Sequence, residues 1–230
     1  GLVGEEAGQH GAKALADSDA FDFVMAGEPT SLNVVYAHKG SCWLHLETSG
    51  VAVHASRPEN GSNAIYKMTE AIECLRRDVA PRLAEKFDPV LGRSTLSVGI
   101  IQGGSKVNIV PDHCEASVDI RTIPGMDTAF VLEMLQQKVP GIQIQMRGSA
   151  PLHTDPSHPL VVCLQSLGSK LEGAPWFCDA AVFASKGSAA IAIGPGSIAQ
   201  AHTADEFISL DDLKKGGDFF LSFLHALRGR

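Results

Sequence analysis

Residues 41–50 read SCWLHLETSG, and this short stretch decides the fold of the middle of the chain. Apolar or small side chains occupy every second position from Cys42 to Thr48, whereas Trp, His and Glu occupy the positions between them. An alternation with a period of two predicts a β-strand with one face in a core and the other in solvent. The stretch is therefore expected to form a half-buried strand, and its neighbours decide which kind of sheet it joins.

The segments that follow alternate between helical and strand patterns. Apolar residues at helical spacing predict a helix within residues 62–77, with Asn60 or Ser62 as its N-cap, and a second helix that starts near Asp127. The segments STLSVGII, CEASVDIR and GIQIQMR read as further strands. The resulting order β-α-β-β-α-β is the split βαβ, or ferredoxin-like, pattern, and we expect it to occupy residues 40–148.

The two flanks of the chain show a different pattern. FDFVMAGE, which ends at Glu28, and AAIAIGPG, which ends at Gly196, are continuous apolar runs. Such runs are typical of strands that are buried on both faces beneath helices. We therefore expect an α/β domain made of residues 1–39 and 149–230, interrupted by an inserted α+β domain of residues 40–148.

Composition narrows the possible functions. The net charge of −7 argues against an electrostatic nucleic-acid surface, and no apolar run reaches the ~20 residues that a membrane span needs. The five cysteines are scattered and form no CxxC motif, which favours reduced, buried thiols in a cytoplasmic protein. The chain therefore reads as a soluble globular protein.

Acidic residues and one histidine follow the ends of the flanking apolar segments. Glu5 and Glu6 come after Leu2-Val3, Glu28 ends its own run, and His202 follows the last run by a loop. Ligands of open α/β sheets bind beyond the carboxyl ends of the strands. Carboxylates and imidazole suit zinc, cobalt or manganese, and a carboxylate next to a ligand can act as a base that activates water. The alternative is that Glu5 and Glu6 are helix-start acids stabilised by the helix dipole.

Five motifs in a fixed order narrow these alternatives. GEEAG, GEPT, GVAVHASRPENGSNAI, GGSKVNIVPDHCEASVDIR and GPGSIAQAHTADE resemble the aminoacylase/acetylornithine deacetylase family of metallopeptidases. This family also contains succinyl-diaminopimelate desuccinylases and glutamate carboxypeptidases, and the last motif is most similar to acetylornithine deacetylases. The resemblance implies a zinc-peptidase-like α/β catalytic domain, here incomplete, that is interrupted by a dimerisation domain, and it implies a homodimer.

The resemblance also assigns roles to the acidic residues and the histidine. It implies that Glu5 is the general acid/base, that Glu6 binds one metal and Glu28 the other, and that His202 completes the metal site. The implied cofactors are two divalent metal ions, with zinc as the first choice and cobalt as the alternative.

Other residues are implied to contact substrate. His54 would reach across the dimer and stabilise the oxyanion in the partner's active site, although a lone strand histidine is more often structural. Arg121 would bind the free carboxylate of the substrate through its guanidinium fork, and Asn108 would contact the substrate too. Gly194 and Gly196 would let the backbone approach the ligand, although a plain strand-ending turn is the alternative.

The chain departs from the family pattern in one important respect. Family members carry an upstream His-x-Asp motif and a bridging aspartate, and neither precedes Glu5 here. We therefore expect the 230 residues to be the C-terminal part of a longer enzyme. His153-Thr154-Asp155 has the spacing of the missing motif, but it follows GSAP instead of an apolar strand, so a loop is expected there.

The function predicted from these residues is metal-dependent removal of an acyl group from an N-acyl amino acid. A desuccinylase-like or carboxypeptidase-like activity stays open, because the residues that would recognise the substrate side chain are not legible in the sequence. The alternative from another class is a non-catalytic chain that dimerises through residues 40–148.

Overall fold

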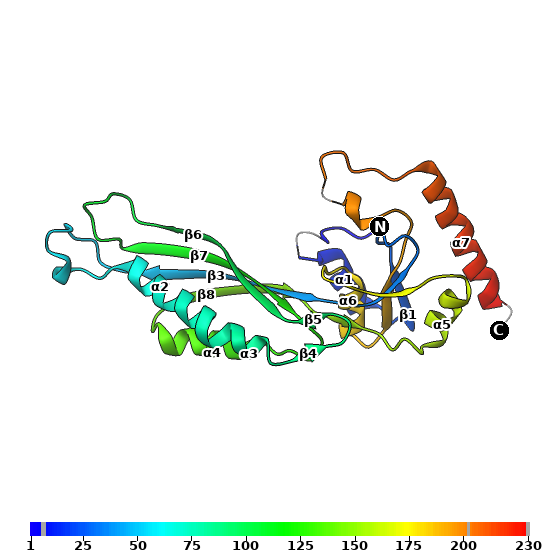
Figure 1. Cartoon of the computed structure of the whole chain (residues 1–230), viewed down its shortest axis with the longest axis horizontal. Helices are drawn as coiled ribbons and strands as arrows, with labels where there is room; N and C mark the ends of the chain where they lie inside the picture. The colour runs from blue at the N-terminus through cyan, green and yellow to red at the C-terminus, as the bar shows by residue number, and fades with distance from the viewer. Residues whose placement is uncertain (6–7, 202, 229–230) are drawn as a thin grey trace. The chain divides into compact units, whose positions relative to one another are not determined.

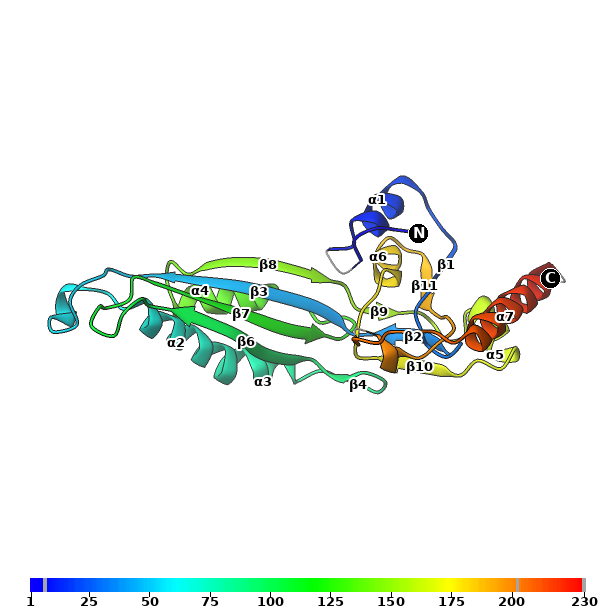
Figure 2. The same cartoon turned by 90° about the horizontal axis from the view of Figure 1, so that it is seen from above.

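The computed structural model of the chain describes residues 1–5, 8–201 and 203–228. The chain divides into two compact units, which Figures 1 and 2 show together. The first is formed by Gly1–Gly40 and Ser149–Arg230, and we call it the discontinuous unit. The second, Ser41–Gly148, is called the inserted unit.

The inserted unit is a four-stranded sheet with helices on one face only (Figure 1). The strand order is β6-β7-β3-β8, and β6 pairs with β7 in antiparallel fashion. This is the order expected of a ferredoxin-like domain, so the predicted fold class is confirmed here. Its principal elements are β3 (Gly40–Ser49), α2 (Ala64–Cys74), β6 (Thr95–Gly103), β7 (His113–Thr122), α4 (Ala129–Lys138) and β8 (Gln143–Ser149). Shorter elements are η1 (Pro58–Asn60), η2 (Leu75–Val79), α3 (Ala80–Leu83), β4 (Phe87–Asp88) and β5 (Gly92–Arg93).

One-sided burial explains why this sheet could be read from the sequence. The side chains of β3 are alternately buried and more exposed from Cys42 onward, and those of β7 alternate likewise. The buried sets pack against α2 and α4 around Met68 and Leu135, both of which are fully buried. The predicted strands thus coincide with strands that cover one core.

The start of α2 differs from the expected position. Its N-cap is Asn63, neither Asn60 nor Ser62, and the Asn63 side-chain oxygen accepts hydrogen bonds from the backbone N–H groups of Ile65 and Tyr66 at 2.9 and 3.2 Å. Asn60 is instead the last residue of the short helix η1, so its backbone already forms part of a different helical turn. Only Asn63 combines an extended backbone with a side chain that reaches the first free N–H groups of the helix.

The discontinuous unit is a mixed sheet covered on both faces by helices (Figure 1). The strand order is β1-β11-β2-β10, with β9 paired to β2. Helices α1 and α6 pack on one face and α5 and α7 on the other, which gives this unit two apolar layers. The strands are β1 (Phe23–Ala26), β2 (Val34–His38), β9 (Leu152–His153), β10 (Leu171–Ala174) and β11 (Ala189–Ala192). The helices are α1 (His10–Ser18), α5 (Pro159–Ser166), α6 (Ala180–Ser185), η3 (Ile198–Gln200) and α7 (Leu210–Arg228).

The two apolar runs of the flanks behave differently in this sheet. Strand β11 lies between β1 and β2, and its residues Ala190, Ile191 and Ala192 are fully buried, as expected. Strand β1 lies at an edge of the sheet formed by the described residues, and Met25 is 37% exposed. The expectation of burial on both faces is therefore wrong for β1, since none of its four residues is fully buried.

Two expectations from composition can be compared with the structure. All five cysteines are free and buried. None of the helices in the described residues combines the length and the apolar character that crossing a bilayer requires.

Candidate active site

A tight corner after β1 holds Glu28 beside the loop that follows β11. Strands β1 and β11 run parallel, so their carboxyl ends meet at the same edge of the sheet. The Thr30 N–H donates to the Gly194 carbonyl at 3.2 Å, and the Gly194 N–H donates to the Thr30 hydroxyl at 3.2 Å. A Cβ at Gly194 would lie 2.6 Å from the carbonyl oxygen of Glu28, so only glycine fits against this backbone. A further hydrogen bond, from the Ser31 N–H to the Gly196 carbonyl at 2.7 Å, holds the second glycine in the same corner.

Glu5 lies in a compact loop that ends where α1 begins. Gly4, Gly8 and Gln9 all have positive φ angles, of 79°, 111° and 59°. The loop closes on itself because the Gln9 N–H donates to the Gly4 carbonyl at 2.6 Å. Helix α1 starts at His10 and has no acidic residue in its first turn, so Glu5 is not the helix-start acid of the alternative explanation.

A buried thiol shows that this loop and the corner after β1 come together. Burial raises the pKa of Cys178, and the carboxylates of Glu28, Glu5 and Asp179 raise it further. A carboxylate raises the pKa of a thiol in this way when it lies within electrostatic reach. Glu5 and Glu28 therefore lie in the same region of the discontinuous unit as Cys178. Glu28 and Asp179 also line one cavity of about 580 Å³ beside β1.

A buried histidine supports the backbone at this point. The Cys178 N–H donates to His38 Nε2 at 3.4 Å, and His38 Nδ1 lies 2.9 Å from the Lys39 carbonyl oxygen. A backbone N–H can only donate and a carbonyl can only accept, so the neutral ring carries its proton on Nδ1. His38 has no exposed surface, and burial lowers its pKa from 6.5 to about 4.

This histidine should make the protein sensitive to acid. Between pH 6.5 and about 4 the unfolded chain binds a proton at His38 that the folded chain does not. The free energy of unfolding should therefore fall as the pH decreases through this window. The total loss between pH 6.5 and pH 4 should be about 3 kcal/mol. Urea unfolding at pH 7 and at pH 4.5 measures the loss. His38→Gln should reduce it, whereas His225→Gln, on the exposed surface of α7, should not; an equal loss in His38→Gln would contradict the assignment.

The predicted metal ligands are only partly described. Glu6 and His202 lie outside the described residues, so the structure places one predicted ligand, Glu28, and the predicted base, Glu5. Within residues 1–5, 8–201 and 203–228, no group of three His, Cys, Asp or Glu side chains stands ready to hold a metal. The convergence of two carboxylates at a strand end nevertheless fits part of a site for a divalent metal such as zinc or cobalt.

The structure brings His54 and Asn108 together in the inserted unit. His54 pairs with Ile109 in an antiparallel bridge, and the Ala55 N–H donates to the Asn108 carbonyl at 2.9 Å. The Ser56 N–H donates to His54 Nδ1 at 3.2 Å, and the Ser56 hydroxyl lies 2.8 Å from the same nitrogen. Nδ1 is thus an acceptor, and the proton of the neutral ring is on Nε2. His54 is exposed, and this tautomer makes Nε2 a donor, which stabilising an oxyanion requires.

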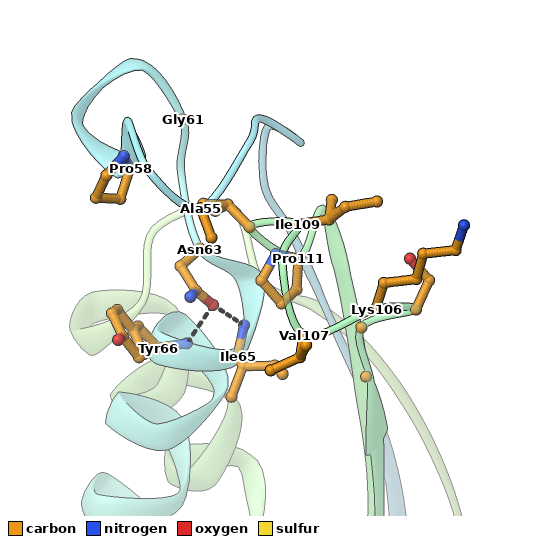
Figure 3. Close-up of a pocket in the computed structure, with 14 residues that line it drawn as sticks. Ala55, Pro58, Gly61, Asn63, Ile65, Tyr66, Lys106, Val107, Ile109 and Pro111 are labelled. Atoms are coloured by element: carbon orange, nitrogen blue, oxygen red, sulfur yellow. Dashed lines mark hydrogen bonds between the residues drawn. The ribbon is translucent and has the colours of Figure 1, made fainter.

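Figure 3 shows the pocket that opens beside this bridge. It has a volume of about 860 Å³. Ala55 and Ile109 line it on one side and the first turn of α2 on another, where the Asn63 side chain is hydrogen-bonded to the Ile65 and Tyr66 N–H groups. The pocket therefore belongs to the same end of the inserted unit as His54.

Arg121 lies at the other end of the same sheet. It is near the end of β7, where it is paired with Thr95, and its Nε and Nη2 both donate to one oxygen of Asp119 at 3.1 Å. The eight residue steps from the start of β7 at His113 to Arg121 span about 26 Å. His54 and Arg121 of one chain are thus too far apart to contact the same small substrate.

The His153-Thr154-Asp155 segment forms no metal motif. His153 is part of β9, and the buried Thr154 N–H donates to the Tyr36 carbonyl at 2.8 Å. Asp155 accepts hydrogen bonds from the Ser157 N–H and hydroxyl at 2.8 and 2.7 Å, which makes it a turn residue ahead of α5. The segment is thus a strand end followed by a turn, so the expected loop is wrong for His153, which pairs with Ala37 of β2, and holds only from Asp155 onward.

Comparison with known proteins identifies one part of the chain. Residues 36–145 match the family model of the peptidase dimerisation domain, M20_dimer. The inserted unit is therefore similar to peptidase dimerisation domains. His54, Asn108 and Arg121 all lie in the matched inserted unit, and the β6 edge of its sheet carries Ile100 and Ile101, both at least half exposed.

Relatives extend the similarity beyond the dimerisation domain. The chain is 34% identical, over 221 residues, to the acetylornithine deacetylase of Photorhabdus laumondii, an alignment that covers 90% of this chain and 57% of the relative. The chain thus spans little more than half the length of that relative. These matches confirm the resemblance that the five motifs predicted.

Solved structures support the fold of both units. A tripeptidase from Staphylococcus aureus superposes with a TM-score of 0.78 at 19% identity, covering 100% of this chain and 63% of the other. An M20 family metallo-carboxypeptidase from Sulfolobus solfataricus superposes with a TM-score of 0.70 at 18% identity, covering 92% and 65%. At this level of identity the likeness concerns the fold alone, in which an α/β layer carries an inserted α+β unit.

Several residues of the site were not predicted from the sequence. Asp179 lines the same cavity as Glu28, His38 accepts a hydrogen bond from the Cys178 N–H, and Ser56 sets the tautomer of His54. Of these residues, only Ser56 could have been found from the local sequence, because a Ser two residues after a His can reach the His ring. The others come from distant parts of the chain, and their proximity depends on the sheet.

Proposed function

We propose that this chain is the larger part of a metal-dependent hydrolase that removes the acyl group from an N-acyl amino acid, as acetylornithine deacetylases do. The observation that carries the proposal is the corner after β1, where backbone contacts fix Glu28 against Gly194 and where Glu28 and Asp179 line a cavity of about 580 Å³. It is supported by the identity of 34% to a deacetylase over 90% of the chain. Acetylornithine is the first substrate to test.

In this proposal Glu6, Glu28 and His202 hold two divalent metal ions, zinc or cobalt, with ligands from the remainder of the enzyme. When bound, such ions polarise an amide carbonyl and acidify water. Oxygen and nitrogen ligands of this kind suit zinc, and Glu28 is held in place by the backbone contacts of the corner after β1.

Each remaining residue then has a defined task. Glu5 takes a proton from the attacking water and delivers it to the leaving amine. His54 donates a hydrogen bond from Nε2 to the oxyanion, Asn108 contacts the substrate beside it, and Arg121 pairs with the substrate carboxylate. Gly194 and Gly196 keep the backbone of the corner close to the bound ligand.

The separation of His54 from Arg121 along β7 supports a site built from two copies of the chain. A homodimer with two-fold symmetry would bring His54 of one copy to the substrate held by the other. The exposed β6 edge of the dimerisation domain, with Ile100 and Ile101, offers unpaired backbone groups and apolar side chains for such a contact. The free, buried cysteines support a cytoplasmic location.

The proposal is tested by hydrolysis of N-acetylornithine with zinc or cobalt added after chelation. The intact enzyme should need the metal and should prefer this substrate to N-succinyl-diaminopimelate and to peptides that end in glutamate. Preference for either of those compounds would change the assigned substrate, and no hydrolysis of any of them with either metal would reject the enzyme class.

The 230-residue chain alone should bind zinc weakly and hydrolyse these substrates poorly. Glu6, Glu28 and His202 cannot fill two sites of about four ligands each. Zinc titration by calorimetry and an activity assay of the purified chain measure both properties. A turnover by the 230 residues close to that of a longer form would show that further ligands are not needed.

A further inference from the structure

A buried glutamine stands between the loop of Glu5 and helix α1. Gln9 is 2% exposed and has φ 59° and ψ 37°, a left-handed conformation that is unfavourable for any residue with a side chain. Such a conformation persists only where surrounding contacts hold it. The main chain of Gln9 supplies two of them, since its N–H donates to the Gly4 carbonyl at 2.6 Å and its carbonyl accepts from the Lys13 N–H at 2.9 Å.

The side chain of Gln9 has a fixed orientation. The Ser149 hydroxyl donates to Gln9 Oε1 at 2.7 Å, which leaves Nε2 pointing the other way. Nε2 is buried, and within the described residues it has no hydrogen-bond partner of normal geometry. The same holds for Oδ1 of Asp179, the residue just before α6.

These two unmatched atoms are complementary, one a donor and the other an acceptor. Burial raises the pKa of Asp179, and the Gln9 side chain opposes this by acting as a hydrogen-bond donor to the carboxylate. Helices α1 and α6, which start beside these two residues, pack in one apolar cluster, so the two unmatched atoms lie in the same buried layer. Asp179 in turn follows Cys178, the residue around which Glu5 and Glu28 converge.

We infer that Gln9 is a positioning residue that ties the loop carrying Glu5 to the start of α6 through Asp179. We call this link through Gln9, Ser149 and Asp179 the tether. Its existence rests on these three residues alone, whereas its importance for catalysis rests on the proposed function of Glu5. An amide is suited to this task because one end accepts from Ser149 while the other donates to Asp179, which no other side chain of that length and charge can do.

The test reverses donor and acceptor. Gln9→Glu keeps the size of the side chain but sets two carboxylates against each other, whereas Gln9→Glu combined with Asp179→Asn restores a donor–acceptor pair. The readouts are hydrogen exchange at Gly4, Glu5 and residues 8–11 without metal, and zinc binding measured by calorimetry. Lys13→Gln, on the exposed face of α1, is the matched control.

Gln9→Glu should speed exchange in these residues about 10-fold, because a buried donor beside the Asp179 carboxylate is replaced by a second carboxylate. The double variant should return to within about 3-fold of the natural chain, because only a direct contact gives such coupling. Unchanged exchange in Gln9→Glu, or a double variant no slower than Gln9→Glu, overturns the tether. If Gln9→Glu does not fold, Gln9→Ala and Asp179→Asn are compared with their double variant in the same assay, and additive effects overturn the tether.

The two readouts separate the tether from the proposed function. If the natural chain binds no zinc under any condition but exchange follows the expected pattern, the tether holds and the proposed metal site fails. If zinc binds and the exchange pattern is absent, the metal site holds and the tether fails. If both are present, Gln9→Glu should also weaken zinc binding, because the proposed ligand Glu6 follows Glu5 directly in the sequence and the segment before α1 is no longer held.

Discussion

Replacing Glu5 by glutamine in the intact enzyme should leave the metal in place and lower kcat by at least ~10²–10⁴-fold, with little change in KM. A general base touches water and not the metal, so its loss removes proton transfer alone. Glu6→Gln should have the opposite signature, because a ligand holds the metal by direct charge contact. It should lose metal affinity, and excess zinc or cobalt should partly restore its activity.

Metal analysis after dialysis, together with kinetics at high zinc or cobalt, distinguishes the two variants. If Glu5→Gln is emptied of metal while Glu6→Gln stays loaded and inactive, the two roles are reversed. If both variants keep their metal and their rates, neither carboxylate belongs to an active site. Glu28→Gln serves as a reference for a ligand, since Glu28 lies at the end of a different element and does not share the loop of Glu5.

Mixing two inactive variants should restore activity if His54 acts on the partner's substrate. His54→Ala should lower kcat by roughly 10²–10³-fold, the loss expected for an oxyanion donor. In a mixed dimer with Glu5→Gln, one site combines the natural Glu5 of one chain with the natural His54 of the other. Random mixing gives one such site in half of the dimers, so activity should recover to about a quarter of the natural level.

The physical reason is the distance along β7. His54 and Arg121 lie at opposite ends of one sheet, so a site that uses both must take them from two chains. Unfolding and reassociation of the mixture, followed by assay, measures the recovery. A mixture that stays as inactive as its components would show that His54 acts within its own chain or not at all; His54→Ala mixed with itself is the control.

The inserted unit was the part best predicted from the sequence, because its sheet is covered on one face only. One-sided burial places an apolar residue at every second position of the strands. Leu44, Leu46 and Ile120 are examples of such buried residues. The N-cap of α2 was misplaced because Asn60, Ser62 and Asn63 all have suitable side chains within four positions. The choice among them depends on backbone angles that the sequence does not display.

The discontinuous unit was harder to predict, for a physical reason that β1 illustrates. A continuous apolar run indicates a strand in an α/β sheet, but it does not tell an edge strand from a central one. Glu28 could be found because it ends such a run. Gln9 and Asp179 could not, because their proximity depends on how α1 and α6 pack on the same face of the sheet.

The two ends of the inserted unit lie side by side, since β3 and β8 are neighbours in its sheet and the backbone of Gly148 passes directly against the Ser41 carbonyl. Once Ser41–Gly148 has folded, its two ends lie close together, so the roughly 100 inserted residues separate the two halves of the discontinuous unit by no more than a short loop would. Closing that gap in an unfolded chain would cost on the order of 3 kcal/mol more than closing a short turn. During synthesis the insertion emerges before β11, so it can fold first and bring Thr30 within reach of Gly194. We therefore expect damage to the core of the inserted unit to delay the assembly of the corner that holds Glu28, even where every residue of the site is intact.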